Sequence, residues 1–141
     1  MALNPKTSSP GRDRALNAVF DFLNSGNMRV CDSTQPTDCE TAVVAQVDLA
    51  DLGFGSTAFN AASGGSKAAT AITQDSSANA NGTATWATCQ ATGVSYGGSN
   101  LRVFDMSAGV SGSTPNLVLN SAGISAFAAV SCSGLTFTQA A

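Results

Sequence analysis

Histidine is absent from this 141-residue chain, and charged residues are scarce. Without histidine the chain lacks the commonest general base, the triads built on it and every zinc site that contains it. Charged residues make up 11% of the sequence, against about 25% in a typical soluble domain. The net charge is −3 and the chain has only 6 Lys and Arg residues, so nucleic acid is not an expected partner.

Long apolar runs are also missing. No stretch approaches the length that spans a bilayer, and the N-terminal sequence MALNPKTSSPGRDR has no apolar segment of the kind found in signal peptides. We therefore expect synthesis in the cytoplasm without a signal peptide, and no membrane partner. Hydrophobic residues still supply 43% of the chain in regular alternation, which favours a folded domain over a disordered linker.

Small neutral residues take the place of charge. Ala, Ser, Thr and Gly together fill about half of the chain. The charges that exist are concentrated near the N-terminus, and the only ones after Leu52 are Lys67, Asp75, Arg102 and Asp105. A surface with so few charges is weakly protected against association, so we expect association to be part of the function.

The N-terminal region divides into an arm and a helix. Residues 1–11 contain two prolines and little to bury, which predicts an extended basic arm. Residues 12–24 place apolar side chains at helical spacing on one face, and Ser25-Gly26 supplies a stop. We predict an amphipathic helix that covers one face of a sheet, or alternatively docks onto a neighbouring subunit. Residues 12–141 then form a single β-rich domain that includes this helix.

After Gly26 the apolar pattern changes from helical to strand-like. About eight short strands are predicted, at residues 28–31, 42–49, 67–73, 83–90, 101–106, 117–120, 127–132 and 135–138. Their length and spacing are typical of a small antiparallel β-sandwich or barrel, so the fold class is mainly β with one N-terminal amphipathic helix. The predicted core comprises Leu16, Val19, Phe20, Leu23, Val30, Val43, Val47, Phe54, Phe59, Ile72, Trp86, Val103, Leu117, Leu119, Ile124, Val130 and Phe137.

Four cysteines are the first candidates for chemistry. Their spacing contains no C-x2-C pair, which argues against a zinc ribbon or a redox motif. Cys31 with Cys39 would close a short loop, and Cys89 with Cys132 would link neighbouring strands. Sequence does not choose among the pairings, and a cytosolic origin favours thiols, so these are candidate disulfides only.

Acidic and aromatic residues offer weaker candidates. The acids Asp32, Asp38, Glu40, Asp48 and Asp51 match no calcium loop, and the segment from Asp75 lacks the glycine and the glutamate of an EF-hand. Trp86 and Tyr96 are candidates for a sugar-stacking platform, although a lone Trp in a strand is more often core. We predict no catalytic residue, no cofactor and no metal site, and hence not an enzyme.

The order of landmarks along the chain resembles a family of short virion proteins encoded beside the capsid genes of tailed phages. The resemblance covers nearly the whole sequence. Its motifs begin with an amphipathic helix at residues 15–20, a short strand at 29–32 and the turn Gln35-Pro36. The remaining motifs are residues 49–54, 58–62, 71–75, 82–86, 104–109, 116–119 and 135–138. The four cysteines and the Gly-rich turn at residues 96–100 depart from the family pattern.

The resemblance implies a capsid decoration (cement) protein, which binds the outer surface of the major capsid shell and stabilises the head. Its expected location is the virion, its partner the major capsid protein, and its state a homo-oligomer on the shell, with a trimer as the candidate symmetry. Lys6, Arg12 and Arg14 form a candidate capsid-contact arm. The alternative is a β-sandwich binding module of a tail or fibre that recognises a host surface glycan.

Overall fold

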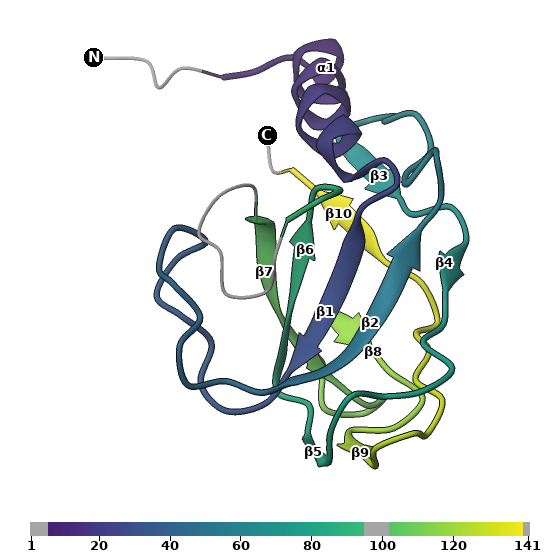
Figure 1. Ribbon diagram of the computed structural model, residues 1–141. Helices are drawn as coiled ribbons and strands as arrows, with labels where there is room; N and C mark the ends of the chain where they lie inside the picture. Colours follow the sequence, from purple (N-terminus) through teal and green to yellow (C-terminus); the bar gives the residue numbers. More distant parts are fainter. Residues whose placement is uncertain (1–5, 95–101, 140–141) are drawn as a thin grey trace.

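The computed structural model describes residues 6–94 and 102–139. It is mainly β with one N-terminal helix and a curled sheet, which confirms the predicted sandwich- or barrel-like class (Figure 1). The elements are α1 (Ser9–Phe20), the 3-10 helix η1 (Asp21–Leu23), β1 (Asn27–Cys31), β2 (Asp48–Phe54), β3 (Ser66–Ala68), β4 (Ile72–Thr73), β5 (Gly82–Thr83), β6 (Trp86–Gln90), β7 (Arg102–Gly109), β8 (Leu117–Val118), β9 (Gly123–Ile124) and β10 (Thr136–Thr138).

Six strands form the main sheet, in the order β4-β2-β1-β6-β7-β8. All neighbours are antiparallel except β7 and β8, which run parallel. Two further pairs, β3 with β10 and β5 with β9, close the two ends of the molecule. Figure 1 shows α1 lying over β3 and β10 at one end, with β5 and β9 at the opposite end.

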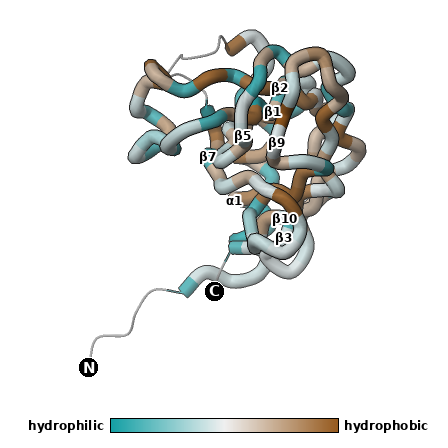
Figure 2. The backbone as a smooth tube through the Cα atoms, turned by 90° about the horizontal axis from the view of Figure 1, so that it is seen from below, coloured by the Kyte–Doolittle hydropathy of each residue, from teal (hydrophilic) through white to brown (hydrophobic). Residues whose placement is uncertain are grey.

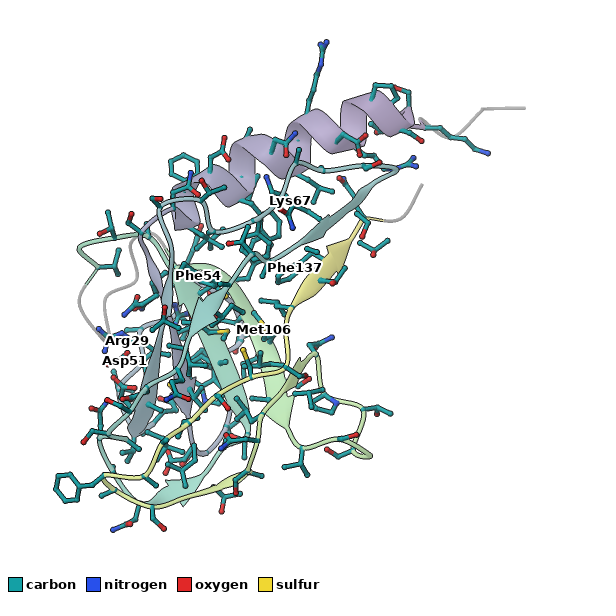
Figure 3. All side chains as sticks on the ribbon, turned by 90° about the vertical axis from the view of Figure 1, so that its right-hand side faces the viewer. Arg29, Asp51, Phe54, Lys67, Met106 and Phe137 are labelled. Carbon is teal, nitrogen blue, oxygen red and sulfur yellow. The ribbon has the colours of Figure 1, made fainter. Side chains whose placement is uncertain are left out.

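One face of the main sheet carries the hydrophobic core. Alternation along β1 turns Met28 and Val30 into the core, while Arg29 and Cys31 belong to the other face. Beneath α1 an aromatic cluster surrounds Phe20, whose ring centroid lies 4.6 Å from those of Phe59 and Phe104 and 4.8 Å from that of Phe137. In Figure 3 the labelled Phe54, Met106 and Phe137 lie in this interior. Aromatic packing therefore fixes the helix on the sheet.

Most of the predicted core is buried or half-buried, with two exceptions. Val19 of α1 is 42% exposed, and Val47 is 41% exposed in a loop. Val43 and Trp86 are buried as predicted, but in a second small cluster with Cys31 on the far face of the sheet.

The helix begins earlier than predicted. Its first residue is Ser9, so residues 9–11 are helical and do not belong to an extended arm. The Ser8 Oγ accepts a hydrogen bond from the Gly11 N–H, and Pro10 lies in the first turn, where its missing N–H costs nothing. Pro10 is thus a helix-initiating residue and does not interrupt regular structure. Residues 1–5 of the predicted arm lie outside the described residues.

Several predicted strands have different bounds. Residues 42–47 form a loop, and the strand expected there is β2, which starts at Asp48. The predicted strand at 67–73 is divided into β3 and β4, and the one at 83–90 into β5 and β6. Residues 127–132 form a turn followed by isolated bridges, not a strand. The described part of the chain has ten strands against the predicted eight: the two divisions add two, the missing strand at residues 127–132 removes one, and β9, which no predicted strand covers, adds one.

Candidate functional site

The four cysteines are present as thiols, so none of the candidate disulfides is formed. Alternation separates two of them: Cys31 packs with Trp86 on one face of the main sheet, and Cys89 lies in the core on the other. Burial raises the pKa of the Cys89 thiol, and burial also raises the pKa values of Cys39 and Cys132. A thiol with a raised pKa is a poor nucleophile, so these residues are not assigned to chemistry.

The candidate contact arm is only partly available for contact. Lys6 and Arg14 are exposed, but Arg12 is turned toward the chain itself. Its Nη1 donates to the Thr7 carbonyl at 2.8 Å and its Nη2 to Ser9 Oγ at 3.1 Å. Arg12 is therefore part of the helix start, and the prediction for the arm reduces to Lys6 and Arg14.

The carboxylates of the acidic residues accept hydrogen bonds from groups of this chain. The Asp38 carboxylate accepts bonds from the Thr41 hydroxyl and the Thr41 and Glu40 N–H groups, which lower its pKa. Asp75 accepts from the N–H groups of Asp51 and Ser77. Among the described residues no group of three or more His, Cys, Asp and Glu side chains is arranged to hold a metal ion.

Trp86 is a buried core residue, as predicted, and not the alternative sugar-stacking platform. Its side chain is buried, and its Nε1 donates to the Asp32 carbonyl at 2.9 Å. The ring thus anchors the start of the loop between β1 and β2 and has no face for a ligand. Tyr96 lies outside the described residues.

A second layer covers the outer face of the main sheet. We call residues 32–47 the covering loop, and the polar side chains on that face of the main sheet the polar sheet face, namely Arg29, Asp48, Asp51, Thr88, Gln90, Arg102 and Asp105. Arg29 Nη1 bonds Asp48 Oδ2 at 2.6 Å, and Arg29 Nε bonds Gln90 Oε1 at 2.8 Å. The labelled Arg29 and Asp51 lie together at one side of the molecule in Figure 3. Arg29 therefore bridges the strands on both sides of it.

Arg102 holds the covering loop to the sheet. Its Nη2 donates to the carbonyls of Asp38 and Thr41, each at 2.8 Å, and its Nε donates to the Cys39 carbonyl at 2.9 Å. The same guanidinium lies 3.3 Å from the Asp105 carboxylate, and the two side chains are 0% and 3% exposed. A planar cation with several donors is suited to three carbonyls at once. Sequence reasoning missed this pair, because the loop it binds lies about 60 residues away.

Among the carboxyl groups of the polar sheet face, Asp48 has a strongly raised pKa. Its pKa rises to about 6, because burial and the neighbouring Asp51 charge disfavour ionisation more than Arg29 favours it. The group therefore titrates just below neutral pH.

The few charges of the β-rich part are largely used inside the fold. Lys67 is buried under α1, where its Nζ donates to Asn17 Oδ1 at 2.7 Å, and Figure 3 shows it below the helix. Asp13 Oδ1 accepts from the Gly65 N–H at 2.7 Å, which ties the helix to β3. The outside of the chain is consequently even poorer in charge than its composition indicates. Figure 2 shows that strongly hydrophilic residues occupy only short stretches of the chain, with pale and brown colours over most of the tube.

An apolar groove opens beside α1. Its volume is about 330 Å³, and the described residues that line it include Leu16, Val19 and Phe20 of α1, Phe104 of β7 and Phe137 of β10. Val19 and the nearby Phe22 are exposed, so apolar surface continues from the groove over the helix end. We call this region the α1 groove. Its chemistry favours contact with an apolar protein surface over a charged ligand.

Comparison with known proteins adds no relative: no family model, no curated protein and no solved structure matches this chain. In the part of the chain that the structure describes, no helix has the length and apolar character required to cross a membrane.

Proposed function

We propose that the chain is a phage virion structural protein, a capsid decoration (cement) protein that binds the outer surface of the major capsid shell and stabilises the head. The observation that carries the proposal is the near absence of charge from the outside of the chain after Leu52. From Met106 to Gln139 the chain has no charged residue, and Lys67, Arg102 and Asp105 are withdrawn into internal contacts.

A neutral surface of small residues suits repeated protein contacts. Such residues lose little side-chain entropy on contact, and they leave no unpaired charge to desolvate. On a shell that presents the same site many times, contacts between neighbouring bound copies add to each weak contact with the shell. A homo-oligomer on the shell, with the trimer as the candidate symmetry, fits this arrangement.

Two features of the helix end provide candidate contacts. The α1 groove and the exposed Phe22 offer apolar surface. Lys6 and Arg14 offer positive charge in the exposed region before and within the first turns of α1. Both features are available to a neighbouring copy or to the shell.

The test is association with heads assembled from the major capsid protein that the same genome encodes. Purified chain is mixed with such heads, sedimented, and the bound copies are counted. The proposal predicts saturation at hundreds of copies per head and greater resistance of the loaded heads to heat and to low salt. No co-sedimentation, or a location in few copies on tails as expected of a glycan-binding module, would contradict it.

A further inference from the structure

Phe127 occupies a backbone position that large side chains rarely adopt. It is the third residue of the turn 125–128, which the Ala128 N–H closes by donating to the Ser125 carbonyl at 3.0 Å. Of the two central residues only Phe127 has a positive φ, +68°, which is the pattern of a type II turn. Glycine or asparagine is usual at that position, because a Cβ there crowds the backbone.

The backbone around the ring is held firmly. The Phe127 N–H donates to the Ala78 carbonyl at 2.8 Å, and the Ala78 N–H donates to the Ala128 carbonyl at 2.9 Å. The Ala126 N–H donates to Asn81 Oδ1 at 2.9 Å. The turn is thus fixed to the opposite segment on both sides of Phe127, and the ring has a defined position.

The ring itself stabilises nothing in the isolated chain. The Phe127 residue is 83% exposed, so neither the unfavourable φ nor the exposed apolar area is offset by burial. Strained positions of this kind persist where a function requires the side chain. An aromatic ring displayed on a rigid turn has the properties of an interface anchor.

The surroundings of the ring are neutral. We call residues 76–81 and 121–129 the tip. They include no charged residue, and β5 and β9 place them at the end of the molecule opposite α1 (Figure 1). Two carboxylates border the tip, where Asp75 accepts from the Ser77 N–H and Asp51 from Asn79 Nδ2. A pocket that accepts this anchor must therefore be apolar with an uncharged rim, because a charge in it would be desolvated without a partner.

We propose that the tip is the shell-facing surface of the chain and that Phe127 inserts into an apolar, uncharged pocket on the outside of the major capsid protein. This inference rests on the proposed function. The size of the tip favours the shell over a second copy: it comprises 15 residues, whereas a stable pair in solution needs about 20–30 residues on each side. A contact this small is useful where it is repeated over an array.

The orientation that follows separates the two ends of the molecule. With the tip on the shell, α1 lies at the outer end, as its position in Figure 1 requires. The α1 groove, Lys6 and Arg14 are then available to neighbouring copies.

The experiment compares three variants of the full-length chain for binding to the assembled heads described above. Phe127→Ala removes the ring and keeps an L-residue at positive φ, while Phe127→Gly removes both the ring and the strain. Val44→Ser is the matched control, because Val44 is 87% exposed but lies on the covering loop. We expect both Phe127 variants to bind about tenfold or more weakly, and Val44→Ser to bind as the parent does.

The outcomes separate the two proposals. Failure of the parent chain to bind heads would overturn the proposed function. Binding by the parent and equal binding by both Phe127 variants would overturn the anchor alone. Sedimentation of the free chains tests whether Phe127 contacts a second copy of this chain instead. Weaker self-association of Phe127→Ala with unchanged head binding would assign the ring to a second copy. Loss of binding to a host glycan, but not to heads, would assign it to sugar, and either result overturns the shell contact.

Discussion

Arg102 and Asp105 lie on the same face of β7 although they are three residues apart, with Arg102 Nη2 3.3 Å from Asp105 Oδ2. Strict alternation would place them on opposite faces. A bulge resolves this, since Cys89 pairs with Phe104 while Gln90 pairs with Arg102, which leaves Val103 as the extra residue. The bulge thereby brings the guanidinium to the polar sheet face, where it binds the covering loop.

Replacement of Arg102 by Met is expected to destabilise the chain by about 3–5 kcal/mol, because it leaves the buried Asp105 without its cation. The covering loop would also lose its donors to three carbonyls, so protease cleavage near residues 38–41 should accelerate. Urea unfolding and limited proteolysis measure the two effects. Arg14→Met, at an exposed helix position, is the control and should stay within about 0.5 kcal/mol of the parent. Equal stability of the two variants would refute the structural role of Arg102.

Asp48 predicts the direction of a pH effect. Its pKa is raised from 3.8 to about 6 in the folded chain by burial and by Asp51, against the opposing charge of Arg29. Between these values the folded chain holds a proton that the unfolded chain releases. The contribution of Asp48 to stability is therefore present below about pH 4 and lost as the pH rises through about 6.

The check is the free energy of unfolding in urea from pH 4 to pH 7.5 for the parent and Asp48→Asn. The Asn variant cannot titrate at this position, so its stability should fall less, or rise more, over that interval. Parallel curves for the two proteins would show that Asp48 does not titrate there.

Gly26 allows the chain to pass closely from η1 into β1. A Cβ at this position would lie 2.2 Å from the Gln90 carbonyl oxygen and 3.0 Å from that of Leu23. Both neighbours are backbone atoms, so Gly26→Ala should cost about 3 kcal/mol through displacement of β1. Gly123→Ala is the matched control, because no heavy atom lies within 4 Å of its added Cβ. Thermal or urea unfolding of the two variants distinguishes them, and a stable Gly26→Ala protein would contradict this close approach.

Phe127→Gly should stabilise the free chain while weakening its binding to heads. Removing the strain of an L-residue at positive φ stabilises the folded chain by about 1–2 kcal/mol. The greater flexibility of glycine in the unfolded chain offsets about half of this. We expect a net gain of about 1 kcal/mol in urea unfolding. Phe127→Ala retains the strained φ and should show no such gain. A clear loss of stability in the Gly variant would mean that the ring contributes to the fold.

The four cysteine thiols should differ in their reactivity toward a thiol reagent, because they differ in burial. Cys31 and Cys89 are buried and should react with a thiol reagent only on unfolding. Cys39 and Cys132 are half-buried with raised pKa values, so they should react in the native chain, but more slowly than a small-molecule thiol at pH 8. Mass spectrometry without reduction should count four thiols, and a mass lower by the hydrogens of one bridge would contradict the structure.

The spacing of apolar residues correctly predicted those elements whose apolar face packs against the core. The helical face of Leu16, Phe20 and Leu23 and the alternation in β1 and β6 both correspond to contacts with one core. The arm boundary was misplaced because Pro10 was read as a breaker, although proline is favoured at a helix start.

Features that depend on contacts between residues far apart in the sequence could not be predicted from apolar spacing. Val43 and Val47 indicate a strand, but the segment is a loop: Arg102, far along the chain, binds the Thr41 carbonyl just before it, and Val47 bonds to Asp32 at its end. Phe127 was assigned to a strand because apolar residues surround it, whereas hydrogen bonds from residues 78 and 81 impose a turn. The polar sheet face and the tip both therefore depend on contacts that no local pattern encodes.

A reconstruction of the intact phage particle tests the central claim most directly. The account predicts many copies of this chain on the outside of the head, with the tip against the shell and α1 outward. Absence of the chain from the head surface, or its presence only on tails, would contradict the decoration function.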